Sequence, residues 1–279
     1  MGEANRKSRS RATILAASPR CIYCANLADS IEHMPPVSMF RDRQRLSGLE
    51  FACCEKCNSG TKAADAVAAL MAFIPRPGNE RDWHSPQMLR LLSAVDQLAP
   101  GFRAELMQGR EWDAGKWIYT KGGILQRAFV ANGDGPILAR HMDVFSAKLG
   151  MALYREHVEE ELPLHGQVYS RWFLNSGLDD RSAQSLLTIL PLNETLKMGK
   201  RVATEQFAYR FNCDGRTIIA ALAGFHSNLH VLTVATSEPS TYGPALSGRK
   251  GLLGIQGEFF KIMAPGDLTA LTAPASGSF

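Results

Sequence analysis

The sequence predicts an α+β protein in which a small, cysteine-stapled module precedes a larger mixed α+β domain. Two Cys-x2-Cys pairs, at Cys21/Cys24 and Cys54/Cys57, mark the module near the start of the 279-residue chain. Beyond them, apolar residues at helical spacing alternate with strand-like segments that end at turn residues. With 45% hydrophobic residues, a chain of this length can bury a substantial core and is expected to hold two domains.

The four paired thiols predict a structural zinc site. A Cys-x2-Cys turn directs both sulfurs at one ion, and two such turns supply the four ligands of a closed tetrahedral site. Cys53 precedes Cys54 directly, but only Cys54 has two-residue spacing to Cys57, so we interpret Cys53 as a buried neighbour. Disulfides are the alternative. The apolar stretch 12–17 is too short for a secretory signal, so we expect a reducing, cytoplasmic setting, which favours zinc.

Three polar residues flank the thiols and are candidates for catalytic roles. Glu32 and His33 are adjacent, directly before the turn residues Pro35 and Pro36. Asn58 follows the last paired cysteine and comes just before an Ala-rich helix expected over residues 63–73. If the cysteines join the two halves of the module, Glu32, His33 and Asn58 converge on one point. Taken alone, each has an ordinary interpretation: a surface carboxylate, a histidine without function and a helix N-cap.

The pattern C21-I-Y-C24, E32-H33-M-P and C54-E-K-C57-N58 resembles the HNH endonucleases with a ββα-metal core, in the zinc-stapled, four-cysteine branch typified by phage recombination endonuclease VII. The resemblance covers residues 15–75. It implies that Glu32 and Asn58 hold a catalytic divalent ion and that His33 is the general base. Many family members have Asp where this chain has Glu32, which makes the ligand one methylene longer, and the interval from Cys24 to Glu32 is short.

The implied reaction is metal-dependent hydrolysis of a phosphodiester in DNA; the residues do not distinguish DNA from RNA, or single from double strands. A neutral imidazole is suited to deprotonating water at neutral pH. Mg²⁺ or Mn²⁺ held by the oxygens of Glu32 and Asn58 would stabilise the departing 3′ oxygen, leaving 5′ phosphate and 3′ hydroxyl ends.

Positive charge is concentrated in the first part of the chain. Residues 1–62 carry ten Lys or Arg against six acids, an excess equal to the net charge of +4 for the whole chain. We predict phosphate contacts from Arg41, Arg43, Arg45 and Lys62, although a solvated lysine is the ordinary interpretation of Lys62. Residues 1–14 are interpreted as a flexible basic arm, with a plain disordered tail as the alternative.

The rest of the chain is expected to form an α+β recognition or regulatory domain over residues 80–270, after a linker at 75–79 and before a loose C-terminus at 271–279. We expect helices over 86–98 (capped by Ser85), 137–158 and 180–190, a strand pair within 112–130, and strands over 167–174 and 207–234 with a turn at Asp214-Gly215. An identical subunit is one candidate partner for this domain.

The chain lacks the sequence motifs of several functional classes. The chain has no Walker loop, no G-x-G-x-x-G and no serine-nucleophile elbow, and no apolar run reaches the length of a membrane span. Two alternatives to a nuclease stay open. One is a catalytically silent zinc module that only binds nucleic acid; the other is a protein-interaction scaffold in which zinc serves folding alone.

Overall fold

The computed structural model describes residues 11–43, 48–74, 84–108, 116–119, 125–128, 133–174, 190–194, 197–198, 201–202, 206–226, 228–247 and 260–269. Arg45, the expected linker at 75–79, almost all of the expected helix at 180–190 and the C-terminus at 271–279 lie outside these ranges. Residues 11–14, expected to belong to the flexible arm, form the start of a helix, and Ile14 in that helix is buried.

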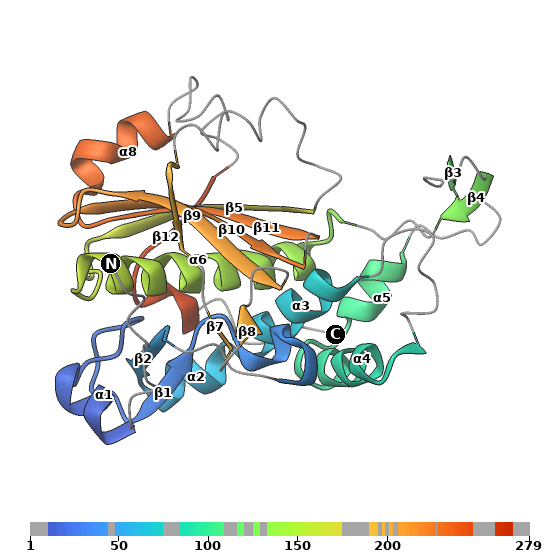
Figure 1. Cartoon of the computed structure of the whole chain (residues 1–279), viewed down its shortest axis with the longest axis horizontal. Coiled ribbons are helices and arrows are strands. Elements are labelled where there is room, and N and C mark those ends of the chain that lie inside the picture. The colour runs from blue at the N-terminus through green and yellow to red at the C-terminus, as the bar shows by residue number, and fades with distance from the viewer. Residues whose placement is uncertain are drawn as a thin grey trace, which may run out of the picture.

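Helices and strands form a mixed α+β structure with the cysteine-rich region first and a sheet domain after it (Figure 1). The helices are α1 (Arg11–Ala17), α2 (Glu55–Gly60), α3 (Lys62–Phe73), α4 (Pro86–Leu98), α5 (Phe102–Met107), α6 (Pro136–Val158) and α8 (Pro239–Ser247), with short 3₁₀ turns η1 (Val37–Met39), η2 (Arg41–Arg43) and η8 (Asp267–Thr269). The strands are β1 (Ser30–His33), β2 (Glu50–Cys53), β3 (Lys116–Tyr119), β4 (Leu125–Ala128), β5 (Gln167–Leu174), β6 (Leu192–Glu194), β7 (Lys197–Met198), β8 (Arg201–Val202), β9 (Phe207–Cys213), β10 (Ile218–Phe225), β11 (Leu229–Thr236) and β12 (Lys261–Met263).

The central sheet has the strand order β12-β5-β11-β10-β9-β6, and every described pairing in it is antiparallel. The β9–β10 turn is fixed by the Asp214 side chain, which accepts hydrogen bonds from the backbone N–H groups of Arg216, Thr217 and Ile218, while Gly215 takes a positive φ of 74°. Along β10, buried residues alternate with partly exposed ones. This alternation and the expected Asp-Gly turn confirm the strand prediction for this region.

Helix α6 lies between the sheet and the N-terminal elements (Figure 1). Its expected apolar stripe is buried, but so are His141, Ser146 and Lys148 on other sides of the helix. A helix that is buried on nearly all sides must have packed neighbours on more than one side. Here these neighbours are the sheet on one side and α3 with the module on the other, whereas α8 covers the far face of the sheet.

The N-terminus of α6 is capped by a side chain from another helix. The buried Glu105 of α5 accepts hydrogen bonds from the backbone N–H groups of Ile137 and Leu138, both at 2.8 Å. These N–H groups have no partner inside the helix, and the carboxylate also faces the positive end of the helix dipole. Helix α4 begins as the sequence predicts, with the Ser85 hydroxyl accepting from Met88 N at 3.2 Å and Pro86 in the first turn.

One hydrophobic core runs through the module, α3 to α6 and one face of the sheet. It joins Tyr23 and Phe40 from the N-terminal part to Phe145 on α6 and to Phe207 and Phe225 on the sheet. The cysteine-rich module is therefore packed against the rest of the chain rather than standing apart from it. Among the described residues, no helix is both long and apolar enough to cross a membrane.

Gly150 sets how closely α6 approaches the sheet. A Cβ atom at this position would lie 2.3 Å from Thr233 Oγ1 and 2.6 Å from Val168 Cγ1. We expect Gly150→Ala to lower the free energy of unfolding by about 1–3 kcal/mol, the usual effect of overpacking a core. Gly133→Ala is the matched control, because a Cβ there would meet no atom within 4 Å. Urea unfolding measures both, and equal stability of the two variants would contradict this packing.

Candidate functional site

The four predicted zinc ligands lie together. Cys21 and Cys24 come from the turn before β1, whereas Cys54 is the N-cap of α2 and Cys57 lies in its first turn. Their sulfur atoms all fall within 4.8 Å of one another, and those of Cys24 and Cys54 are 3.6 Å apart. Zn–S bonds of 2.3 Å in a tetrahedron place sulfurs about 3.8 Å apart, so the cluster fits one structural zinc ion.

Cys53 is a neighbour of this cluster and not a fifth member of it. Its sulfur lies 3.8 Å from that of Cys21, and its backbone is part of β2, opposite Ser30. The adjacent Cys21 sulfur, followed by burial, raises the pKa of the Cys53 thiol, so this group stays protonated. The two-residue spacing therefore identified the correct partner of Cys57.

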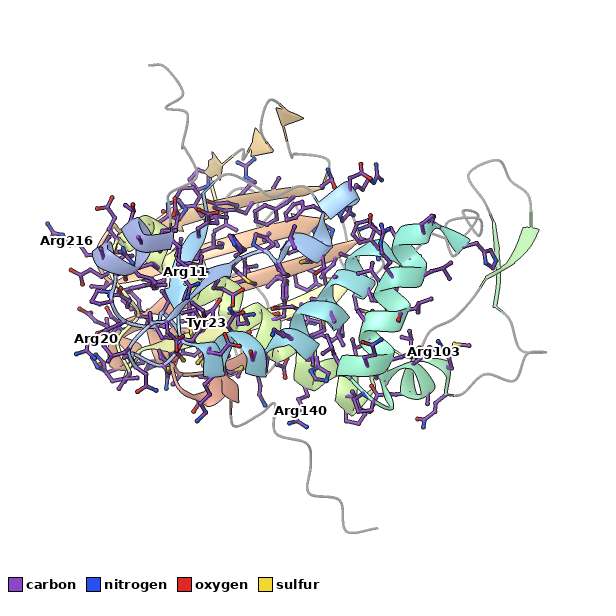
Figure 2. All side chains as sticks on the ribbon, turned by 90° about the horizontal axis from the view of Figure 1, so that it is seen from below. Arg11, Arg20, Tyr23, Arg103, Arg140 and Arg216 are labelled. Carbon is purple, nitrogen blue, oxygen red and sulfur yellow. The ribbon has the colours of Figure 1, made fainter. Side chains whose placement is uncertain are left out.

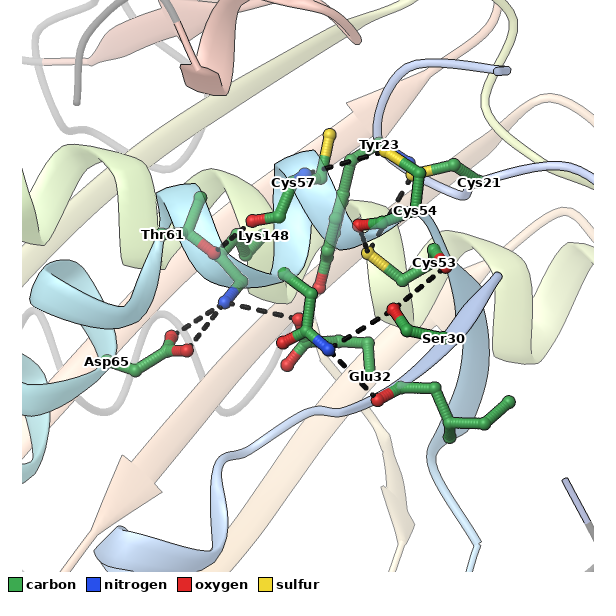
Figure 3. Close-up of polar contacts among 12 residues, drawn as sticks. Cys21, Tyr23, Ser30, Glu32, Cys53, Cys54, Cys57, Thr61, Asp65 and Lys148 are labelled. Atoms are coloured by element: carbon green, nitrogen blue, oxygen red, sulfur yellow. Dashed lines mark hydrogen bonds and ion pairs between the residues drawn. The ribbon is translucent and has the colours of Figure 1, made fainter. Parts of the chain in front are cut away.

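Glu32 is buried and forms an ion pair with a lysine from the sheet domain. Its side chain is 4% exposed, and its Oε2 lies 3.4 Å from Nζ of Lys148, which is 0% exposed. The same Nζ donates to both carboxylate oxygens of Asp65 on α3, at 2.7 and 2.8 Å. Figure 3 shows the Lys148 amine between the two carboxylates. Three elements thus meet at one ammonium group: β1, α3 and α6.

The charges of this cluster are strongly coupled. Burial raises the pKa of Glu32, although the nearby Lys148 partly opposes this effect. Burial likewise raises the pKa of Asp65 against the influence of Lys148. For Lys148, burial alone would lower the pKa, but Asp65 and Glu32 outweigh it, so the pKa is raised and the lysine stays charged. Burial and the Lys148 ammonium thus act in opposite directions on the pKa values of the two carboxyl groups.

Asn58 braces the backbone of the neighbouring strand. Its side-chain amide donates to the Ser30 hydroxyl at 3.2 Å and to the Ile31 carbonyl oxygen at 3.4 Å. These two bonds hold α2 against β1. The described contacts of Asn58 are thus with β1, whereas those of Glu32 are with Lys148.

His33 has a different partner from its neighbour Glu32. Successive residues of an extended strand point to opposite faces. Accordingly, Glu32 reaches α6, whereas His33 Nδ1 lies 3.5 Å from Oε1 of Glu50, its cross-strand partner on β2. The His33 side chain is 25% exposed, beside a small hollow that Pro35, Phe40 and Leu49 help to line. The three predicted catalytic side chains therefore have separate partners.

The predicted phosphate-contacting residues are only partly described. Arg41 is exposed, and its backbone N–H donates to the Gln206 side chain. Lys62 is exposed at the start of α3, where its Nζ lies 3.3 Å from the Ser59 hydroxyl. Nothing is described of the Arg43 side chain. Figure 2 shows further arginines, among them Arg20, projecting from the surface, whereas Tyr23 lies inside.

Sequence reasoning missed Lys148, Asp65 and Glu50. A signal for the first two was present, because Lys148 is the one charged residue in the stretch 144–154 and Asp65 the one in 63–75. A lone charge inside an apolar helical stretch has to be paired if it is buried. Two such charges of opposite sign indicate a buried pair. Glu50 gave no comparable signal, since its role follows only from the β1–β2 register.

We expect Cys57→Ser to lose bound zinc and to unfold the N-terminal elements, because a structural zinc site contributes directly to folding. Cys213→Ser is the matched control: this thiol lies outside the four-sulfur cluster, on β9. Elemental analysis should find one zinc per chain in the wild type and in the control, and much less in Cys57→Ser. Full zinc content in Cys57→Ser would contradict the assignment of this ligand.

We expect Lys148→Met to lower the free energy of unfolding by about 3–5 kcal/mol, since removing one partner leaves buried carboxylates without compensation. Lys62→Met is the control, because this exposed lysine is expected to contribute no more than about 0.5 kcal/mol. Chemical denaturation with zinc content verified in each sample measures the difference. A loss below about 1 kcal/mol for Lys148→Met would show that the ion cluster is dispensable.

Comparison with protein-family models, with curated protein sequences and with solved structures finds no match for this chain. What the structure shows by itself is a four-cysteine cluster suited to zinc, within a mixed α+β chain whose N-terminal module packs on a sheet domain.

Proposed function

We propose that the chain is a zinc-stapled HNH-type endonuclease that hydrolyses phosphodiester bonds in DNA, with His33 as the general base. The observation that supports this most directly is the pairing of His33 with Glu50 on a small strand–strand–helix unit, β1, β2 and α2, which the four cysteines hold together. This order of elements agrees with the ββα core of the family that the cysteine, histidine and asparagine pattern resembles.

The chemistry assigned to His33 is removal of a proton from the attacking water. A carboxylate beside one ring nitrogen orients an imidazole and favours the protonated form that results from the transfer. Glu50 supplies such a carboxylate, and the exposed quarter of the His33 side chain gives water access to the ring. In this proposal Glu50 is a positioning residue and His33 the residue that meets the substrate.

The divalent ion implied by the resemblance does not fit the described side chains as they lie. Lys148 already places a positive charge beside Glu32, and the Asn58 amide nitrogen donates to the Ile31 carbonyl oxygen of β1, which leaves the amide oxygen as its one possible ligand atom. The described contacts of these side chains thus assign no step to Mg²⁺ or Mn²⁺ at Glu32 and Asn58. The ions remain part of the proposal only as conditions to be varied in the assay.

The proposed substrate is DNA, with RNA as the variant to compare. Arg41 and Lys62 are exposed near the module, and Arg43 and Arg45 come from the segment that leads toward β2. Lysine and arginine contacts to phosphates position a nucleic acid without reading its sequence. Binding through them is expected to weaken steeply as salt rises.

A second candidate is a zinc-stapled module that binds nucleic acid without cutting it. The specific observation in its favour is Lys148, which pairs with the carboxylate that an HNH-type site would use for its metal ion. This candidate shares the zinc site and the basic residues with the first. The two differ in whether His33 has a chemical role.

The test is cleavage of plasmid and single-stranded DNA by purified protein with Mg²⁺, with Mn²⁺ and without either ion. We expect His33→Ala to reduce the cleavage rate by about 10²- to 10⁴-fold, the usual contribution of a general base. His165→Ala is the control, since this histidine is exposed and lies outside the module. Zinc content should be unchanged in both variants.

Cleavage that survives in His33→Ala at the wild-type rate would contradict the assigned base. DNA binding without any cleavage by the wild type, at full zinc content, would favour the second candidate.

A further inference from the structure

The cluster of Glu32, Asp65 and Lys148 has the features of a cation-binding centre whose cation belongs to the chain itself. Two carboxylates from different elements face one ammonium group, and the lysine is fully buried. Taking three charged groups out of water is costly, and a buried lysine is stable only with close anionic partners. The cluster is therefore assembled by the tertiary fold, since its members come from three separate parts of the chain.

The anionic side of this centre exceeds the cationic side. Among the described residues, two carboxylates face a single positive charge, and Oε2 of Glu32, in a side chain that is 96% buried, accepts no hydrogen bond from any of them. Lys148 Nζ lies 3.4 Å from this oxygen of Glu32. The same Nζ lies closer to Asp65, at 2.7 Å from Oδ1. A pair of carboxylates with an oxygen that lacks a hydrogen bond is the kind of donor set that Mg²⁺ and Mn²⁺ prefer.

The position of Lys148 is fixed by the packing of α6. Gly150, two residues further along, lies against Thr233 and Val168 of the sheet with no room for a Cβ atom. Residues two apart on a helix are about 200° apart around its axis, so Lys148 points away from the sheet, toward the module. Glu105 holds the N-terminus of the same helix. The ammonium can leave the carboxylates only if its long side chain finds another buried position or if α6 shifts.

We propose that Lys148 is the resident cation of a centre formed by Glu32 and Asp65, and that it excludes a divalent ion from Glu32 as long as α6 is docked. The ammonium and a divalent ion would occupy the same space between the two carboxylates. In the absence of the lysine charge, the centre would take one Mg²⁺ or Mn²⁺. The sheet domain, through α6, thus decides which cation the N-terminal module holds.

The test uses Mn²⁺ alone as the probe and requires no DNA. Electron paramagnetic resonance and calorimetry count the Mn²⁺ bound by full-length wild type, Lys148→Met and the double variant Lys148→Met/Glu32→Gln, each with its zinc content verified. We expect no specific Mn²⁺ in the wild type, one per chain in Lys148→Met and none in the double variant. Mn²⁺ should also raise the melting temperature of Lys148→Met while leaving that of the wild type unchanged.

Two results would overturn the proposal. The first is specific Mn²⁺ binding by the wild type that is lost in Glu32→Gln. This comparison needs no Lys148 variant, so it tests the proposal even if the Lys148 variants do not fold. The second is a folded Lys148→Met without Mn²⁺ binding. If Lys148→Met does not fold, Lys148→Gln replaces it, because its amide can still donate to Asp65 without a positive charge. The readout is independent of cleavage, so failure of the nuclease proposal and failure of this one are separately visible.

Discussion

The contact of one buried ammonium with two carboxylates joins three elements of this molecule that are well separated in the sequence. Lys148 lies in the middle of α6, Asp65 on α3 and Glu32 on β1, and their charged atoms approach within 2.7 to 3.4 Å. Buried charges need such partners, so docking of α6 on the module is most stable when all three are in place. Because α6 also packs on the sheet, this contact helps to hold the module against the rest of the chain.

The four-cysteine cluster, with the zinc ion that it suits, and the ion cluster are expected to stabilise the module in different ways. The four cysteines connect the turn before β1 to the start of α2, which is a local connection. Lys148 supplies one buried ionic connection to α6, which packs on the sheet. A zinc ion is therefore expected to decide whether the module folds. The ion cluster is expected to help position the folded module against α6. His33 and Glu50 depend on both, since their pairing follows from the β1–β2 register.

Much of the fold could be predicted from the sequence because the relevant signals are local. Helix α4 follows from Ser85-Pro86, β5 from its run of strand-forming residues, and the β9–β10 hairpin from Asp214-Gly215. Short elements such as α1 and α5 were missed, since six or seven residues give little periodicity. Within the candidate site, two-residue spacing identified the four cysteines whose sulfurs lie together. The partner of Glu32 could not be predicted, because a lone lysine in an apolar helix indicates a buried pair without saying which acids complete it.

Strand geometry explains why the predicted catalytic residues do not all meet. Adjacent residues of an extended strand point to opposite faces, so Glu32 and His33 reach different partners although they are neighbours in sequence. The family pattern gives the order of the residues, and it takes no account of a lysine contributed by a helix more than a hundred residues later. That lysine places a positive charge beside the carboxylate that precedes His33.

The most direct measurement is anomalous X-ray diffraction from crystals of the full-length protein grown with zinc and soaked in Mn²⁺, with data collected at both absorption edges. This account predicts one zinc peak among the sulfurs of Cys21, Cys24, Cys54 and Cys57, and no manganese peak between Glu32 and Asp65, where Lys148 remains. A manganese peak at Glu32 with the lysine displaced would contradict it.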